Sequence, residues 1–190
     1  SNLVDYVDPF IGTGGHGHTY PGATVPFGMV QVSPDNGKNG WDYSSGYHYS
    51  DSTIAGFSMT HLSGTGIGDL CDLSFMPITI GKADTSEGGV YSEFTHSNES
   101  AEPGYYSVKM ANNVEVELTA TKRVGMYRYS FPADSNQAVS LDLGFSINWD
   151  NPVKTSINVE NDSLVTGYRH STGWADDQRV FFAVKFSKPI

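Results

Sequence analysis

The chain has 190 residues, of which 38% are hydrophobic, and its formal net charge is −10 with only 11 Lys and Arg residues. No apolar run approaches the roughly 20 residues that a membrane-spanning helix needs, and so few scattered basic residues disfavour nucleic acid as a partner. Cys71 is the only cysteine, which excludes a disulfide framework within the chain and a cysteine zinc site.

The segment GTGGHGHTYPGATVPFG, residues 12–28, contains the G-x-G-x-x-G spacing of dinucleotide-binding loops. Such a loop binds phosphate because a helix begins directly after the glycines and points its free N–H groups at the anion. Pro21 and Pro26 oppose a helix here, since proline lacks the N–H donor and pushes the preceding residue toward an extended conformation. We therefore predict an irregular loop in which the glycines allow close backbone approach.

The same loop carries His16 and His18 at positions i and i+2. In an extended segment both rings would project to one side. A metal could bind there, but two histidines without a third nearby ligand make an incomplete site. We expect these two histidines to bond to backbone or to substrate, and we assign no metal ligand in this chain.

The segment GWDYSSGYHYSD, residues 40–51, mixes aromatic rings with carboxylates and hydroxyls. Sugar sites have this composition, because a pyranose offers an apolar C–H face to a ring and hydroxyls to polar partners. The alternative is that Trp41 and the tyrosines only pack the loop against the rest of the domain. Composition does not decide between the two.

The segment THLSGTGIGDLCDLSFMPI, residues 60–78, places His61 and Asp69 around a glycine-rich turn before an apolar strand. A histidine and an aspartate could act as a base and the residue that orients it. Alternatively, His61 hydrogen bonds a backbone carbonyl and Asp69 caps the turn, and for each residue taken singly this second interpretation is favoured.

From about Val90 onward, apolar and polar residues alternate with a period of two, which predicts strands. In NVEVELTA, the valines and Leu118 would face the core and the glutamates would face water. No window of comparable length shows a helical stripe. Regular spacing of short strands predicts an all-β sandwich, with seven strand segments at residues 104–111, 113–121, 124–131, 138–144, 156–161, 163–169 and 179–187.

Taken together, YVDPFIGTGGHGHTYPGATVPFGMVQVSPD and GWDYSSGYHYSDSTIAGFSMTHLSGTGIGDLCDLSFMP, with the strands that follow, resemble the N-terminal domain of glycoside hydrolase family 92. That family consists largely of bacterial exo-α-mannosidases. The resemblance implies a β-sandwich of the galactose mutarotase-like supersandwich type, followed by a larger helical domain. It also implies inverting, calcium-dependent hydrolysis of α-mannosides of glycans, including N-glycans.

In the family, the general acid, general base and main calcium ligands belong to the helical domain. The resemblance therefore implies that residues 1–190 are a truncated N-terminal domain, inactive alone, which contributes substrate contacts and no catalytic residue. The end of the chain on a strand, without a terminal cap or tail, also favours truncation. We expect the loops between Phe10 and Phe75 to expose an apolar and aromatic patch toward the helical domain.

The expected substrate-contacting residues converge on one face of the sandwich. In some relatives an aromatic residue stands near the position of Gly66, so the glycine here puts a stacking contact from that position in doubt, and Trp41 could supply a ring instead. The predicted set is His16, His18, Trp41, His61, Gly66 and Asp69.

Two other functions stay open at this point. One is a free-standing carbohydrate-binding β-sandwich, and the other is a mutarotase-like sugar enzyme in which His61 and a carboxylate transfer protons. The sequence carries no signal peptide. Export to the periplasm, the cell surface or the medium of a bacterium is implied by the family resemblance only.

Overall fold

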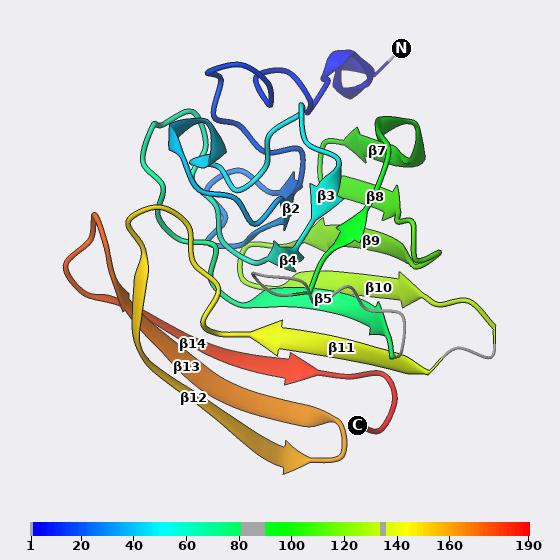
Figure 1. Cartoon of the computed structure of the whole chain (residues 1–190), viewed down its shortest axis with the longest axis vertical. Coiled ribbons are helices and arrows are strands. Elements are labelled where there is room, and N and C mark those ends of the chain that lie inside the picture. Colours follow the sequence, from blue (N-terminus) through cyan, green and yellow to red (C-terminus); the bar gives the residue numbers. More distant parts are fainter. Residues whose placement is uncertain (1, 81–89, 134–135) are drawn as a thin grey trace.

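The computed structural model describes residues 2–80, 90–133 and 136–190, and in these ranges the chain is an all-β structure with three short 3-10 helices (Figure 1). The 3-10 helices are η1 (Leu3–Tyr6), η2 (Trp41–Tyr43) and η3 (His96–Asn98). The strands are β1 (Ala23–Thr24), β2 (Gln31–Asp35), β3 (Thr53–Ile54), β4 (Gly56–Ser58), β5 (Ser74–Thr79), β6 (Ser92–Glu93), β7 (Glu99–Glu102), β8 (Tyr105–Lys109), β9 (Glu115–Ala120), β10 (Gly125–Ser130), β11 (Gln137–Asp142), β12 (Asn151–Asn161), β13 (Leu164–Thr172) and β14 (Gln178–Lys185).

The strands of the described residues form antiparallel sheets that pack in layers. A five-stranded sheet has the order β1-β2-β4-β5-β11, a four-stranded sheet β10-β9-β8-β7, and a three-stranded sheet β12-β13-β14, while β3 pairs with β6. Strand β5 contributes to both apolar cores: Met76 packs with the four-stranded sheet and Phe75 with β11 and β14. The all-β sandwich predicted from the alternation is confirmed.

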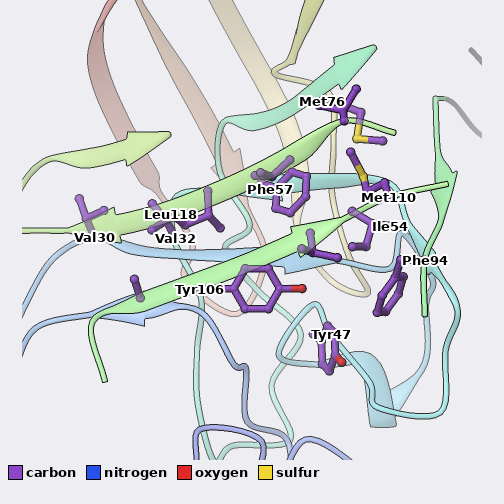
Figure 2. Packing of buried hydrophobic residues seen from close by; sticks show 14 residues of the cluster. Val30, Val32, Tyr47, Ile54, Phe57, Met76, Phe94, Tyr106, Met110 and Leu118 are labelled. Carbon is purple, nitrogen blue, oxygen red and sulfur yellow. The ribbon is translucent and has the colours of Figure 1, made fainter. Parts of the chain in front are cut away.

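The first core lies between the five-stranded and four-stranded sheets (Figure 2). Val114, Val116 and Leu118 are buried there, whereas Glu115 is exposed, as the period of two predicts. Each of the seven predicted strand segments overlaps one observed strand, from β8 to β14, although β12 begins five residues earlier and β13 ends three residues later than predicted.

The region before residue 75 contains more regular structure than its sequence suggests. Strand β2 includes Pro34, which pairs with Phe57 of β4. The SFMPI segment forms β5, as predicted, although it contains Pro77. Prolines interrupt the alternation of apolar and polar residues, and strands of two or three residues are too short to show it, so these strands are hard to predict from the sequence.

The loop that begins at Gly12 is irregular and does not start a helix, as the prolines predict. Its backbone turns sharply: the Thr19 N–H donates to the Gly12 carbonyl at 3.2 Å. A Cβ at Gly17 would lie 2.1 Å from that same carbonyl oxygen, so only glycine fits. The glycines serve close backbone approach, as predicted.

Arg169 of β13 connects the loop region to the three-stranded sheet through a buried ion-pair network. Its guanidinium is fully buried and bonds the carboxylates of Asp72 and Asp150. Its remaining donors go to the backbone carbonyls of Leu143 at 3.0 Å and Phe145 at 2.8 Å. The five N–H donors of the guanidinium have a fixed geometry, and they hold together β13, the segment of Asp72 and the segment of residues 143–150.

Exposed apolar side chains do occur in the loops between Phe10 and Phe75. They are Ile11, Phe27, Met29, Trp41 and Tyr49. That they form one patch facing another domain stays a prediction. Among the described residues, no helix is long and apolar enough to cross a membrane.

Candidate functional site

An exposed tryptophan forms the centre of the candidate site. Trp41 opens η2, and its side chain remains 56% exposed. The rings of His16 and His18 lie against it, with centroid distances of 5.2 Å and 4.3 Å. The structure therefore brings both histidines of the predicted set next to Trp41. The backbone of His18 is in the left-handed region (φ 55°) and not in the extended conformation that the sequence suggested.

Asp42, the residue after Trp41, ties the two histidines to the same loop. Its Oδ1 lies 2.6 Å from His16 Nδ1 and 3.6 Å from His18 Nε2. The first distance is a hydrogen bond, and the second is too long for one. The hydrogen bond from His16 lowers the pKa of Asp42, so the cluster presents a carboxylate beside an aromatic ring.

His18 Nε2 is buried and has no hydrogen-bond partner among the described residues. A polar atom that is buried and unpaired costs free energy, and such atoms are common where a ligand supplies the missing partner.

Gly66 lies directly beside the Trp41 indole. A Cβ at this position would lie 2.2 Å from Trp41 Nε1 and 3.0 Å from Cε2. The absence of a side chain at Gly66 is therefore what allows the indole to occupy its place. That Trp41 supplies a ring to a sugar stays a prediction.

An open pocket of about 390 Å³ adjoins Trp41 and Gly66. Its other walls are Gly40, the first residue of the predicted segment 40–51, and three residues that sequence reasoning missed, Asn39, Asn148 and Trp149. A tryptophan between two predicted strands, in the segment SINWDN, was the available signal for Trp149. The volume falls in the range of small-ligand pockets.

Asn148 closes the pocket by bridging distant parts of the chain. Its side chain accepts from the Gly40 N–H at 2.7 Å and donates to the Gly40 carbonyl at 3.0 Å. Its own N–H donates to Asn39 Oδ1 at 2.9 Å, and the Trp149 N–H donates to the Gly68 carbonyl at 3.1 Å. Three loops are thereby fixed around one opening.

His61 lies in the interior, away from any surface that a substrate could reach. Its side chain is fully buried. Nδ1 lies 2.8 Å from the Gln31 carbonyl oxygen, and Nε2 lies 2.7 Å from Asp35 Oδ1. The alternative interpretation, a histidine that bonds a backbone carbonyl, therefore describes His61.

Asp69 is also buried, and burial raises the pKa of its carboxyl. Its Oδ2 accepts from the Ala175 N–H at 3.3 Å, while Oδ1 has no partner among the described residues. Asp69 thus joins its loop to the turn between β13 and β14. It does not line the pocket beside Trp41.

The tyrosines of residues 40–51 mostly hold the loop in place. The Tyr47 side chain is fully buried, and its hydroxyl donates to Glu99 Oε1 at 2.7 Å. The Tyr43 hydroxyl donates to Asp51 Oδ2 at 3.0 Å, and Tyr49 stacks on His96 with a centroid distance of 3.9 Å. In this segment the tyrosines pack the loop against the domain, as one interpretation of the sequence had it. Trp41 instead leaves its ring exposed, as the sugar-site interpretation requires.

Comparison with known proteins gives a consistent family match. The model of the glycosyl hydrolase family 92 N-terminal domain matches residues 6–190. A family GH92 α-mannosidase from Bacteroides thetaiotaomicron, solved in complex with mannoimidazole, is 40% identical with a TM-score of 0.93, covering 100% of this chain and 26% of that one. A family GH92 inverting mannosidase from the same organism is 28% identical with a TM-score of 0.71, covering 100% of this chain and 30% of that one.

A curated relative shows the same partial coverage. An uncharacterized secreted glycosidase of Arthroderma benhamiae is 28% identical over 175 residues, which are 86% of this chain and 22% of the relative. The chain therefore spans about a quarter of the length of the proteins it resembles.

Proposed function

Because this chain belongs to glycosyl hydrolase family 92, whose N-terminal domain model matches residues 6–190, we propose that it is the substrate-contacting domain of an inverting exo-α-mannosidase. The substrates would be α-mannosides of glycans. Since the chain spans about a quarter of its relatives, the hydrolytic activity would belong to the whole protein.

The observation that carries the proposal is the pocket at Trp41. An exposed indole next to a carboxylate and a histidine suits a pyranose, whose C–H face stacks on a ring and whose hydroxyls bond polar groups. Asn148 is already bonded on both its oxygen and its nitrogen. Asp42 and His16 do not line the pocket itself, but both are partly exposed beside Trp41, and we propose that they meet sugar hydroxyls there.

Inverting hydrolysis needs a carboxylic acid and a carboxylate about 6.5–9.5 Å apart, on either side of the scissile bond. We place both in the larger helical domain that the family resemblance implies. The residues described here would then bind and orient the sugar at one wall of a divided site and exclude water from that side. On this basis the chain alone is expected to be inactive.

Calcium, which the family resemblance implies, does not fit the described residues. Calcium takes six to eight oxygen ligands. Among the described residues, the one group of three or more histidine, cysteine and carboxylate side chains whose ligand atoms converge is Asp35, His61 and Cys71, which includes nitrogen and sulfur. We therefore propose that calcium is bound by the helical domain.

We also propose that the protein is exported, to the periplasm or surface of a bacterium. The curated relative is called a secreted glycosidase, and glycans are met outside the cytoplasm. The mutarotase-like alternative is disfavoured, because His61, its proposed proton-transfer group, is fully buried.

Hydrolysis of α-mannobiosides tests the proposal. The chain of residues 1–190 and the protein at the full length of its relatives would each be assayed with calcium and with a chelator. Activity only in the longer, calcium-loaded protein is the expected result. Turnover by residues 1–190 would mean that catalytic groups lie in this domain and would overturn the proposal.

Substitutions at the pocket test the role of Trp41 in the longer protein. Trp41→Ala should lower kcat/KM about 2- to 10-fold, since a stacking contact is worth roughly 0.5–1.5 kcal/mol. Gly66→Ala should have a similar effect, because its methyl group would displace the indole. Trp174→Ala is the matched control, since Trp174 is also exposed but does not line the pocket. Equal losses for Trp41→Ala and Trp174→Ala would contradict the assignment.

A further inference from the structure

A second cluster of chemically reactive side chains lies inside the domain, below the loop of residues 40–51. Asp35 ends β2, Ser58 ends β4, and His61 and Cys71 lie on the segment between β4 and β5. All four are buried. One ligand atom each from Asp35, His61 and Cys71 lies within 4.8 Å of the others.

The hydrogen bonds of His61 determine what its Nε2 atom can do. The Gln31 carbonyl, 2.8 Å from Nδ1, only accepts, so Nδ1 carries a proton and donates. In neutral imidazole, Nε2 then presents a lone pair. That lone pair faces Asp35 Oδ1 at 2.7 Å and the Ser58 hydroxyl at 3.1 Å. At 2.7 Å these two atoms need either a shared proton or a metal ion between them.

A proton could bridge the histidine and the aspartate, but it joins only two atoms. Two further side chains contact this pair, the Ser58 hydroxyl at His61 Nε2 and the Cys71 thiol at Asp35 Oδ1. Cys71 Sγ lies 3.4 Å from Asp35 Oδ1, and the Ser58 hydroxyl also hydrogen bonds the Cys71 side chain. A metal ion can join all four donors at once.

From this geometry we propose that Asp35, His61 and Cys71, with the Ser58 hydroxyl as fourth ligand, form a tetrahedral zinc site. One oxygen, one nitrogen and one sulfur are ligands that zinc combines in proteins. The Nδ1–H bond to a backbone carbonyl is the support that metal-binding histidines usually have. A single cysteine rules out only a zinc site built from several cysteines, and because it shows no ligand spacing along the chain, the sequence assigns no metal ligand.

Two of the ligand-to-ligand distances can be compared with those that zinc requires. Bond lengths of about 2.0–2.3 Å give ligand-to-ligand edges of roughly 3.3–3.5 Å in a tetrahedron. The nitrogen-to-oxygen distance of 2.7 Å would need to open by roughly 0.5 Å. The sulfur-to-oxygen distance of 3.4 Å already fits.

The site has no open position, which assigns it a structural role. Gly46 covers it: a Cβ there would lie 2.1 Å from Asp35 Oδ1 and 3.1 Å from the His61 ring. Structural zinc sites are closed in this way, whereas catalytic ones leave room for water. The ion would hold β2, β4 and the segment of Cys71 together beneath the loop that presents Trp41.

Zinc binding must remove the proton of the Cys71 thiol. Burial raises the pKa of this thiol well above its usual value, so the thiol is protonated when no metal is bound. A coordinated zinc ion deprotonates a thiol outright. The thiol proton is released to water, and binding is therefore expected to weaken as the pH falls.

The test is metal binding by the purified protein at its natural length. After loading with zinc and removal of excess metal, elemental analysis of the wild type should show one more zinc ion per chain than Cys71→Ala. His170→Gln is the control, since His170 lies on β13 outside the cluster and should keep the ion. Equal zinc content in the wild type and Cys71→Ala would overturn the proposal.

Cobalt substitution keeps the test decisive if Cys71→Ala fails to fold. Cobalt bound to a thiolate gives a sulfur-to-metal charge-transfer absorption, which the wild type should show and the nearly isosteric Cys71→Ser should lack. Absence of this absorption in the folded, cobalt-loaded wild type would overturn the proposal. This outcome is independent of the proposed function, because the readout is metal ligation and not hydrolysis.

Discussion

The two halves of the molecule are held together by different interactions. From β7 onward, neighbouring strands pair in long antiparallel ladders, and their apolar side chains alternate into shared cores. Before residue 75, strands are short, and order depends on buried polar contacts such as Asp35 with His61 and Asp72 with Arg169. A region poor in regular structure can thus still adopt one defined conformation, provided that its buried polar groups find partners elsewhere in the fold.

The comparison predicts that removing a buried charge is far more damaging than removing an exposed one. Arg169→Met would leave Asp72 and Asp150 buried without their cation, and should lower the free energy of unfolding by about 3–5 kcal/mol. Arg128→Met is the control, because the Arg128 side chain is 72% exposed, and its ion pair with Glu117 should contribute about 0–1 kcal/mol. Urea denaturation measures both. Equal losses would show that the buried network does not hold the loops.

A smaller effect is expected from the tyrosine hydroxyls of β8. The Tyr106 hydroxyl donates to Glu99 Oε2 at 2.7 Å, and the Glu99 side chain is buried. Tyr106→Phe should cost about 1.5–3 kcal/mol, the value of a hydrogen bond to a charged group.

Its neighbour provides the matched control. The Tyr105 hydroxyl makes an equally short bond to Glu117, but on the partly exposed side of the strand. Water can replace the lost donor there, so Tyr105→Phe should cost less than about 1 kcal/mol. Equal losses in the free energy of unfolding for the two variants, measured by chemical denaturation, would show that burial does not strengthen the hydrogen bond to Glu99.

The smallest expected effect concerns pH. Burial raises the pKa of Asp69 above its value in the unfolded chain, which is about 3.9. The folded protein therefore binds this proton more tightly, and the resulting stability is present below the unfolded pKa and lost as the pH rises through the folded pKa. Asp69→Asn should remove this loss, so that the variant gains stability relative to wild type as the pH rises through that window.

Thermal unfolding measured across the acidic range would check this. Asp177→Asn is the control, because Asp177 is exposed and its hydrogen bond from Arg179 lowers its pKa, giving a dependence of opposite sign. A constant difference between Asp69→Asn and wild type at every pH would show that Asp69 does not titrate as its burial implies.

Of the candidate site, the sequence indicated Trp41 with its two histidines but not the opposite wall of the pocket. Trp149 and Asn148 lie more than 100 positions further along the chain. They reach Gly40 only because the turn before β12 folds back over it. His61 and Asp69 were chosen for their chemistry, and both are buried, since residue type alone does not tell a solvent-facing group from an interior one.

The sequence by itself determined the strands from β8 to β14, because an alternation of period two acts locally: each residue's face follows from its neighbours. It also determined the absence of a phosphate-binding helix after Gly17, because prolines act on the adjacent backbone. Only the tertiary structure decided the pocket and the cluster of Asp35, His61 and Cys71. Their members come from separate strands and loops, and the distances between such segments are set by how the sheets pack.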